Sequence, residues 1–183
     1  MLLGGSFNLL QEQSQAVSEA EWMTRAIPDG NPLGFIIWHA TRTIDWGIHC
    51  AIQGVPEVVD RPEWKHLLAS EAAYGAGVSP QEAERVAQAV HRDVVRDYLG
   101  AVRDASLSWL SNAQASDLDQ VPDILGHQEA NRRYLDPPVW GEVSSLAGLP
   151  AWKILARPCI SHVRVHSGEI DLALQVVRAR ANE

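Results

Sequence analysis

The sequence has little of what would place it in several common classes of protein. Its two cysteines, Cys50 and Cys159, lie far apart in the chain, so no disulfide framework is expected. Basic residues are outnumbered, with 15 Lys and Arg against 23 Asp and Glu, and the formal net charge is −8. Nucleic acids and anionic membranes are bound largely through clustered basic side chains, so neither is an expected partner. We expect a small-molecule substrate instead.

Long apolar runs and alternating patterns are also missing. No run reaches the roughly 18 apolar residues of a transmembrane helix, and the start, MLLGGS, lacks the basic region of a signal peptide. We therefore expect a cytoplasmic protein. No segment alternates apolar and polar residues with the period of a strand, and no internal repeat is present. The 183 residues fit a single domain over residues 1–183.

Helical signals dominate, and they predict an all-α fold, a four-helix bundle with two long connections at residues 54–78 and 114–149. The third helix has the clearest start, since Ser79 is followed by Pro80 and then by Glu82, as in a capping box. A connection as long as 114–149 usually shapes a site or carries short structure of its own. The four helices are expected over residues 6–17, 33–53, 79–112 and 151–179, with a kink at Pro158 in the last.

Two histidines of the last predicted helix point to metal chemistry. His162 and His166 are four residues apart, so their rings project from one face, and Glu169 follows on the same line. Both histidines fall inside the apolar stripe of this helix, where an unpartnered polar group costs about 1–3 kcal/mol. A histidine pair with this spacing is also the geometry by which one helix chelates a metal ion. For each histidine alone, a satisfied core or surface residue is the competing interpretation.

The second predicted helix offers a third ligand, His39, at the border of its own apolar stripe. Three imidazoles suit Zn, Ni, Fe(II) or Cu, with Zn or Ni preferred here and Fe next. A set of three ligands also leaves a coordination position open, as catalytic sites do. The other histidines are predicted to be solvated, with His127 the best substitute ligand because its loop can fold over the site. They are His49, His66, His91 and His127.

Two charged residues are candidate catalytic groups beside the histidines. Arg42 is predicted to face away from the core stripe of its helix, where it either binds a substrate carboxylate or forms a surface ion pair with Asp45. Glu169 either orients a histidine, acts as a base, or is a buried spectator. On the outer side of the same helix as Arg42, Trp38 and Ile52 suggest a partner surface.

Two short segments resemble the DinB-like superfamily. Residues 34–46, GFIIWHATRTIDW, resemble the second helix of these proteins, with an apolar run, a histidine, and then Arg and Asp. Residues 162–170, HVRVHSGEI, resemble their last helix, which carries a His-x-x-x-His pair followed by Gly and an acidic or amide residue. The resemblance covers nearly the whole chain in order and spacing.

The resemblance implies an up-up-down-down four-helix bundle, often a homodimer, with a metal site at His39, His162 and His166. Family members of known activity are thiol-dependent transferases and isomerases that use mycothiol or bacillithiol. The implied function is therefore a metal-dependent S-transferase or isomerase that acts on a small electrophile. Two alternatives remain open: a hydrolase that uses a metal-activated water, and a non-enzymatic dimeric bundle linked to stress.

Overall fold

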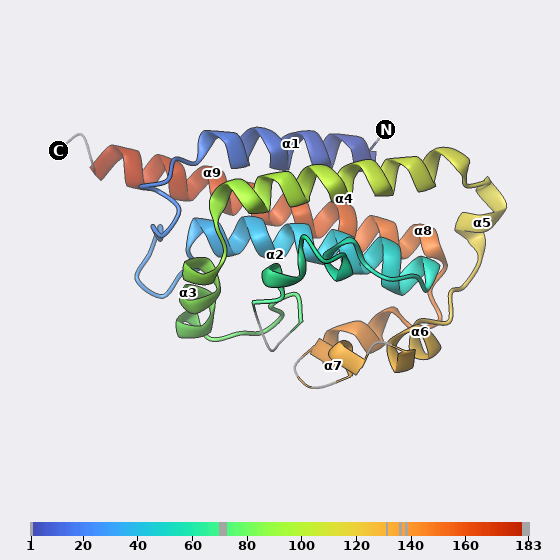
Figure 1. Cartoon of the computed structure of the whole chain (residues 1–183). Helices are drawn as coiled ribbons and strands as arrows, with labels where there is room; N and C mark the ends of the chain where they lie inside the picture. Colours follow the sequence, from blue (N-terminus) through green and yellow to red (C-terminus); the bar gives the residue numbers. More distant parts are fainter. Residues whose placement is uncertain (1, 70–72, 131, 136, 138, 181–183) are drawn as a thin grey trace.

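The computed structural model describes residues 2–69, 73–130, 132–135, 137 and 139–180, and these residues are helical or irregular with no strand among them (Figure 1). The predicted all-α class is confirmed. Within this part of the chain, no helix has both the length and the apolar character needed to cross a membrane.

Four long helical segments make up most of the fold, and shorter helices connect them. The long segments are α1 (Leu2–Ala16), α2 (Leu33–Asp45) continued by a π-helix (Trp46–Gln53), α4 (Arg92–Asn112), and α8 (Ala151–Ile154) joined through a π-helix (Leu155–Ser161) to α9 (His162–Arg180). The short helices are α3 (Pro80–Ala89), α5 (Ala115–Asp119), α6 (Ile124–Ala130) and α7 (Val139–Val143), and single 3₁₀ turns lie at Val58–Asp60, Lys65–Leu67, Arg132–Tyr134 and Ser144–Leu146.

The long segments lie side by side, and both α1 and α2 pack against α4 and α9. Figure 1 shows α1 and α9 running in one direction and α2 and α4 in the other. The expected up-up-down-down order is therefore wrong, because it needs crossovers after the first and third helices. Residues 17–32 instead turn back where α1 ends, with Gly34 N–H bonded to the Trp22 carbonyl, and the crossover lies in residues 54–78 together with α3.

The third predicted helix is split into α3 and α4. Ser79 caps α3 as predicted, accepting the Glu82 N–H at 3.2 Å. At the other end, Val90 is extended (φ −107°, ψ 125°) and the chain bends before α4. The Trp22 indole N–H lies 3.1 Å from the Ala87 carbonyl and 3.2 Å from that of Val90. This donor satisfies carbonyls that a continuing helix would have bonded, so a contact distant in sequence fixes the break.

The predicted kink at Pro158 takes the form of the π-helix between α8 and α9. Proline has no N–H to give to an α-helical bond, and a wider turn accommodates the missing donor. Gly47 of the other π-helix packs directly opposite, where a Cβ would lie 2.8 Å from the Cys159 sulfur. Close approach of the two π-helices therefore requires glycine at this position.

The connection 54–78 covers the outer side of α2. Val58, Val59 and Leu67 join the main core, and the Trp38 indole donates to the Leu67 carbonyl at 2.8 Å. Trp38 is fully buried and Ile52 is partly buried, so the prediction that they form a partner surface is wrong. The sequence pattern gave α2 one apolar face, whereas this helix is buried along its whole length.

The connection 114–149 forms α5, α6 and α7 and packs over the π-helix that continues α2. It builds a second apolar cluster beside the main core, in which Ile124, Tyr134 and Val143 pack with Trp46 and Tyr74. Glu142 of α7 and Ser145 and Leu146 of the turn that follows it line one side of a cavity next to His162.

Candidate metal centre

Three histidines from α2 and α9 converge on one point. His39 Nε2 lies 3.3 Å from His162 Nε2, which in turn lies 3.1 Å from His166 Nε2. A ligand atom from each histidine lies within 4.8 Å of the other two, and this group could hold a metal ion. The structure thus brings together the two histidines placed by helical periodicity and the third one suggested by resemblance.

The Nδ1 contacts of His39 and His166 determine which nitrogen of each ring carries the hydrogen. His39 Nδ1 is 2.5 Å from the Tyr74 carbonyl, and His166 Nδ1 is 2.9 Å from a carboxylate oxygen of Glu169. Both acceptors lack a hydrogen, so each Nδ1 must donate. A neutral imidazole carries one N–H, and the Nε2 atoms of His39 and His166 therefore present bare lone pairs.

Burial favours the neutral form of His39 and of His162. Desolvation, reinforced by the neighbouring histidines, lowers the pKa of His39 to about 3, and desolvation followed by His166 lowers that of His162 to about 4. With neutral rings, only His162 can offer a hydrogen to the centre, and it can donate to one neighbour. At most one of the two short Nε2–Nε2 contacts can then be a hydrogen bond, whereas a cation between the three nitrogens would satisfy both.

The nitrogen spacing suits such a cation. Zinc binds imidazole nitrogen at about 2.0–2.1 Å, so two nitrogens of a tetrahedral site lie about 3.3 Å apart. The observed 3.1 and 3.3 Å fit this spacing. The two described thiols are elsewhere in the core, and burial raises the pKa of Cys50 to about 12 and that of Cys159 further. The ligand set is therefore nitrogen only.

A tight loop holds the acceptor for His39. Ala73 has φ +55°, a left-handed conformation that is unusual for alanine, and Gly75 has φ +87°. A Cβ on Gly75 would lie 2.9 Å from the Trp38 ring. The loop thus brings the Tyr74 carbonyl against α2 at a conformational cost, as is common at functional sites.

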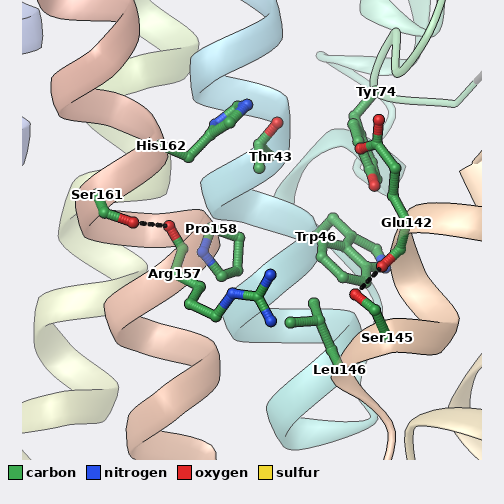
Figure 2. Close-up of a pocket in the computed structure, with 10 residues that line it drawn as sticks. All are labelled: Thr43, Trp46, Tyr74, Glu142, Ser145, Leu146, Arg157, Pro158, Ser161 and His162. Atoms are coloured by element: carbon green, nitrogen blue, oxygen red, sulfur yellow. Dashed lines mark hydrogen bonds between the residues drawn. The ribbon is translucent and has the colours of Figure 1, made fainter.

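Two cavities open beside the histidines. One, of about 230 Å³, is lined by all three histidines together with Phe35 and the loop 75–78. The other, of about 290 Å³, lies against His162 and is shown in Figure 2. His162 and Glu142 line both. The second cavity is lined by Thr43, Trp46, Tyr74, Glu142, Ser145, Leu146, Arg157, Pro158, Ser161 and His162.

Of the two candidate catalytic residues, Glu169 lies at the centre and Arg42 does not. Glu169 holds His166 Nδ1, which fits one of the three roles considered for it, that of orienting a histidine. Arg42 is fully buried, so the prediction that it faces away from the core is wrong. Its guanidinium lies 2.7 Å from Glu57, 3.4 Å from Asp45, 3.1 Å from the Tyr98 hydroxyl and 3.2 Å from that of Tyr134.

The remaining histidines divide into two groups. His66 and His91 are exposed, as predicted. His49 is buried, with Nδ1 2.7 Å from an Asp45 carboxylate oxygen, because residues 54–60 cover this side of α2; its predicted exposure is wrong. His127 is half-buried and lies 3.1 Å from the Ala51 carbonyl, away from the three-histidine centre.

Glu142 and Arg157 are cavity residues that the sequence patterns did not single out. Glu142 comes from α7, inside the connection predicted to shape a site or to carry short structure of its own. Arg157 precedes His162 by five residues, which an α-helical wheel places on another face. In a π-helix the bonds run from i to i+5, so these residues lie about one turn apart on the same face.

Comparison with known proteins does not assign a family or a function to this chain. No protein-family model matches the sequence, and no curated protein is significantly similar to it. The resemblance to DinB-like proteins therefore stays a prediction from the residues of α2 and α9.

Proposed function

We propose that this protein is a metal-dependent enzyme of the DinB-like superfamily, a thiol-dependent transferase or isomerase that acts on a small electrophile. The observation that carries the proposal is the convergence of three imidazole Nε2 atoms, two of them bare, at the edge of an open cavity. In this proposal the four long segments form a DinB-like four-helix bundle whose helix order is the one in Figure 1, not up-up-down-down, and the protein is a cytoplasmic homodimer.

His39, His162 and His166 would hold one divalent ion, Zn or Ni before Fe. A cation bound there supplies Lewis acidity, which lowers the pKa of a coordinated thiol. The Tyr74 carbonyl and Glu169 fix two of the rings so that their lone pairs point inward without rearrangement. The layer formed by residues 114–149 shields the second cavity from solvent on one side.

A thiol screen on metal-loaded protein tests the transferase assignment. We expect one of mycothiol, bacillithiol, coenzyme A or glutathione to raise the melting temperature by several degrees, since a ligand at 100 times its Kd adds about 2.7 kcal/mol. His39→Ala should remove this shift, whereas His66→Ala, at an exposed histidine away from the centre, should preserve it. Metal-loaded protein that responds to none of the four thiols contradicts the transferase proposal and favours the hydrolase.

A further inference from the structure

The cavity beside His162 contains two oppositely charged side chains that the proposed metal centre does not use. Glu142 and Arg157 both line it, and both are exposed. Among the described residues, neither side chain takes part in a salt bridge or a hydrogen bond, with the other or with a neighbour. Figure 2 shows Glu142 beside Tyr74 and the Arg157 guanidinium directed toward Leu146, so the two charges stand apart.

A local departure from α-helical geometry places Arg157 at this position. The π-helix around Pro158 brings it onto the same face as His162, and Pro158 itself forms part of the cavity wall. Apolar surface from Trp46 and Leu146 lines the cavity near it. A guanidinium at the edge of an apolar wall, one turn from a candidate metal ligand, is arranged to bind an anionic group of a molecule that also reaches the metal.

We propose that Arg157 binds the carboxylate of a small, singly charged organic acid whose other end reaches His162, and that Glu142 disfavours a second negative charge. This inference rests on the proposed function, which places the reacting groups at His162. Arginine presents a planar pair of N–H donors that matches a carboxylate. The 290 Å³ volume is at the small end for ligand pockets, which limits the acid to a few carbon atoms.

The carboxylate-binding role that the sequence suggested for Arg42 is therefore assigned to Arg157. The Arg42 guanidinium already lies against Glu57, Asp45 and two tyrosine hydroxyls, and it is fully buried. The Arg157 guanidinium faces the cavity from a helix that also carries two of the three histidines.

Two small thiols of opposite charge test the assignment. Cobalt-loaded protein is titrated with 3-mercaptopropionate and with cysteamine, and the sulfur-to-cobalt charge-transfer band reports binding. If the bound carboxylate is that of the thiol, we expect Arg157→Gln to weaken binding of 3-mercaptopropionate about tenfold and not to weaken binding of cysteamine. Glu142→Gln should strengthen 3-mercaptopropionate about twofold and weaken cysteamine. Lys153→Gln, which removes an exposed positive charge one turn earlier and outside the cavity, is the matched control and should change neither.

Propionate, which lacks sulfur, and neutral 2-mercaptoethanol show whether the carboxylate bound by Arg157 belongs to the thiol or to the electrophile. If the carboxylate belongs to the thiol, 3-mercaptopropionate binds more tightly than neutral 2-mercaptoethanol, and Arg157→Gln removes the difference. If it belongs to the electrophile, the two thiols bind equally, and propionate raises the melting temperature in an Arg157-dependent way with 2-mercaptoethanol bound.

Failure of this inference is distinguishable from failure of the metal site. Cobalt can bind while the carboxylate-binding role of Arg157 fails. This is the result if Arg157→Gln changes the binding of 3-mercaptopropionate and of propionate no more than Lys153→Gln does. Absence of cobalt binding overturns the proposed function. The propionate measurement on metal-free protein then still decides the assignment of Arg157: an Arg157-dependent shift in melting temperature upholds it, and no such shift overturns it.

Discussion

Replacing His162 with alanine is expected to abolish stoichiometric binding of a divalent metal ion. His162 is the central ring of the three, with its Nε2 within 3.3 Å of both other Nε2 atoms. Losing a partner of a ligating histidine typically costs 10–100-fold in metal affinity, so losing a ligand itself should cost more than about 100-fold. Competition against a chromophoric zinc chelator measures the affinity.

A graded series makes this prediction specific. Glu169→Gln retains the ligand set and changes only the group that holds His166 Nδ1, so it should weaken metal binding by about 10–100-fold. His66→Ala, at an exposed histidine, should bind metal like the wild type. In wild-type protein, metal at 1,000 times its Kd should add about 4.1 kcal/mol to the free energy of unfolding. A His162→Ala variant that is folded and keeps wild-type affinity contradicts the site.

Arg42→Ala should destabilise the protein by about 3–5 kcal/mol, measured by chemical denaturation. Asp45 and Glu57 share the Arg42 guanidinium in a buried network that Tyr98 and Tyr134 close, and Arg133 reaches Glu57 from the rim at 3.3 Å. Burial raises the pKa of Glu57, and Arg42 opposes the rise; for Asp45, bonds from His49 and the charge of Arg42 outweigh burial and leave its pKa lowered. Without Arg42, both carboxylates lose this counter-charge in the core.

An exposed arginine provides the comparison. Arg178 forms an ion pair with Glu21 at 2.7 Å, but its side chain is 51% exposed, and solvent screens the pair. Arg178→Ala should therefore shift the denaturation midpoint far less than Arg42→Ala. Equal shifts for the two variants would show that the buried network does not stabilise the fold.

The sequence predicted the helical class and the His162–His166 pair because both follow from a period of 3.6 residues. Glu169 falls on the same line for the same reason, and its carboxylate lies 2.9 Å from His166 Nδ1. His39 lay only at the border of a stripe, and the resemblance rather than periodicity made it a ligand.

The environment of Arg42 was beyond the reach of the same reasoning. A helical wheel assigns one buried face and one solvated face, whereas α2 is buried on all sides, by α4 and α9 and by the connections 54–78 and 114–149. Arg42 and His49 were therefore placed in solvent, and Trp38 on a partner surface, although the chain folds over all three. Irregular connections have no period from which such a cover can be predicted.

Arg157 was missed for a different reason. Its alignment with His162 depends on a π-helix, and a wheel drawn at the α-helical angle turns it away. Pro158 was the available signal, since it marked the place where regular α-helical geometry had to change.

X-ray absorption at the zinc edge of zinc-loaded protein tests the central claim most directly. A three-histidine centre predicts three imidazole nitrogens at about 2.0–2.1 Å, with outer-shell scattering from the rings and no sulfur at about 2.3 Å. Cys50 and Cys159 lie elsewhere in the core, so sulfur has no place in the ligand shell. A shell that contains sulfur, or one built from oxygen without imidazole scattering, would contradict the proposal that His39, His162 and His166 hold the metal.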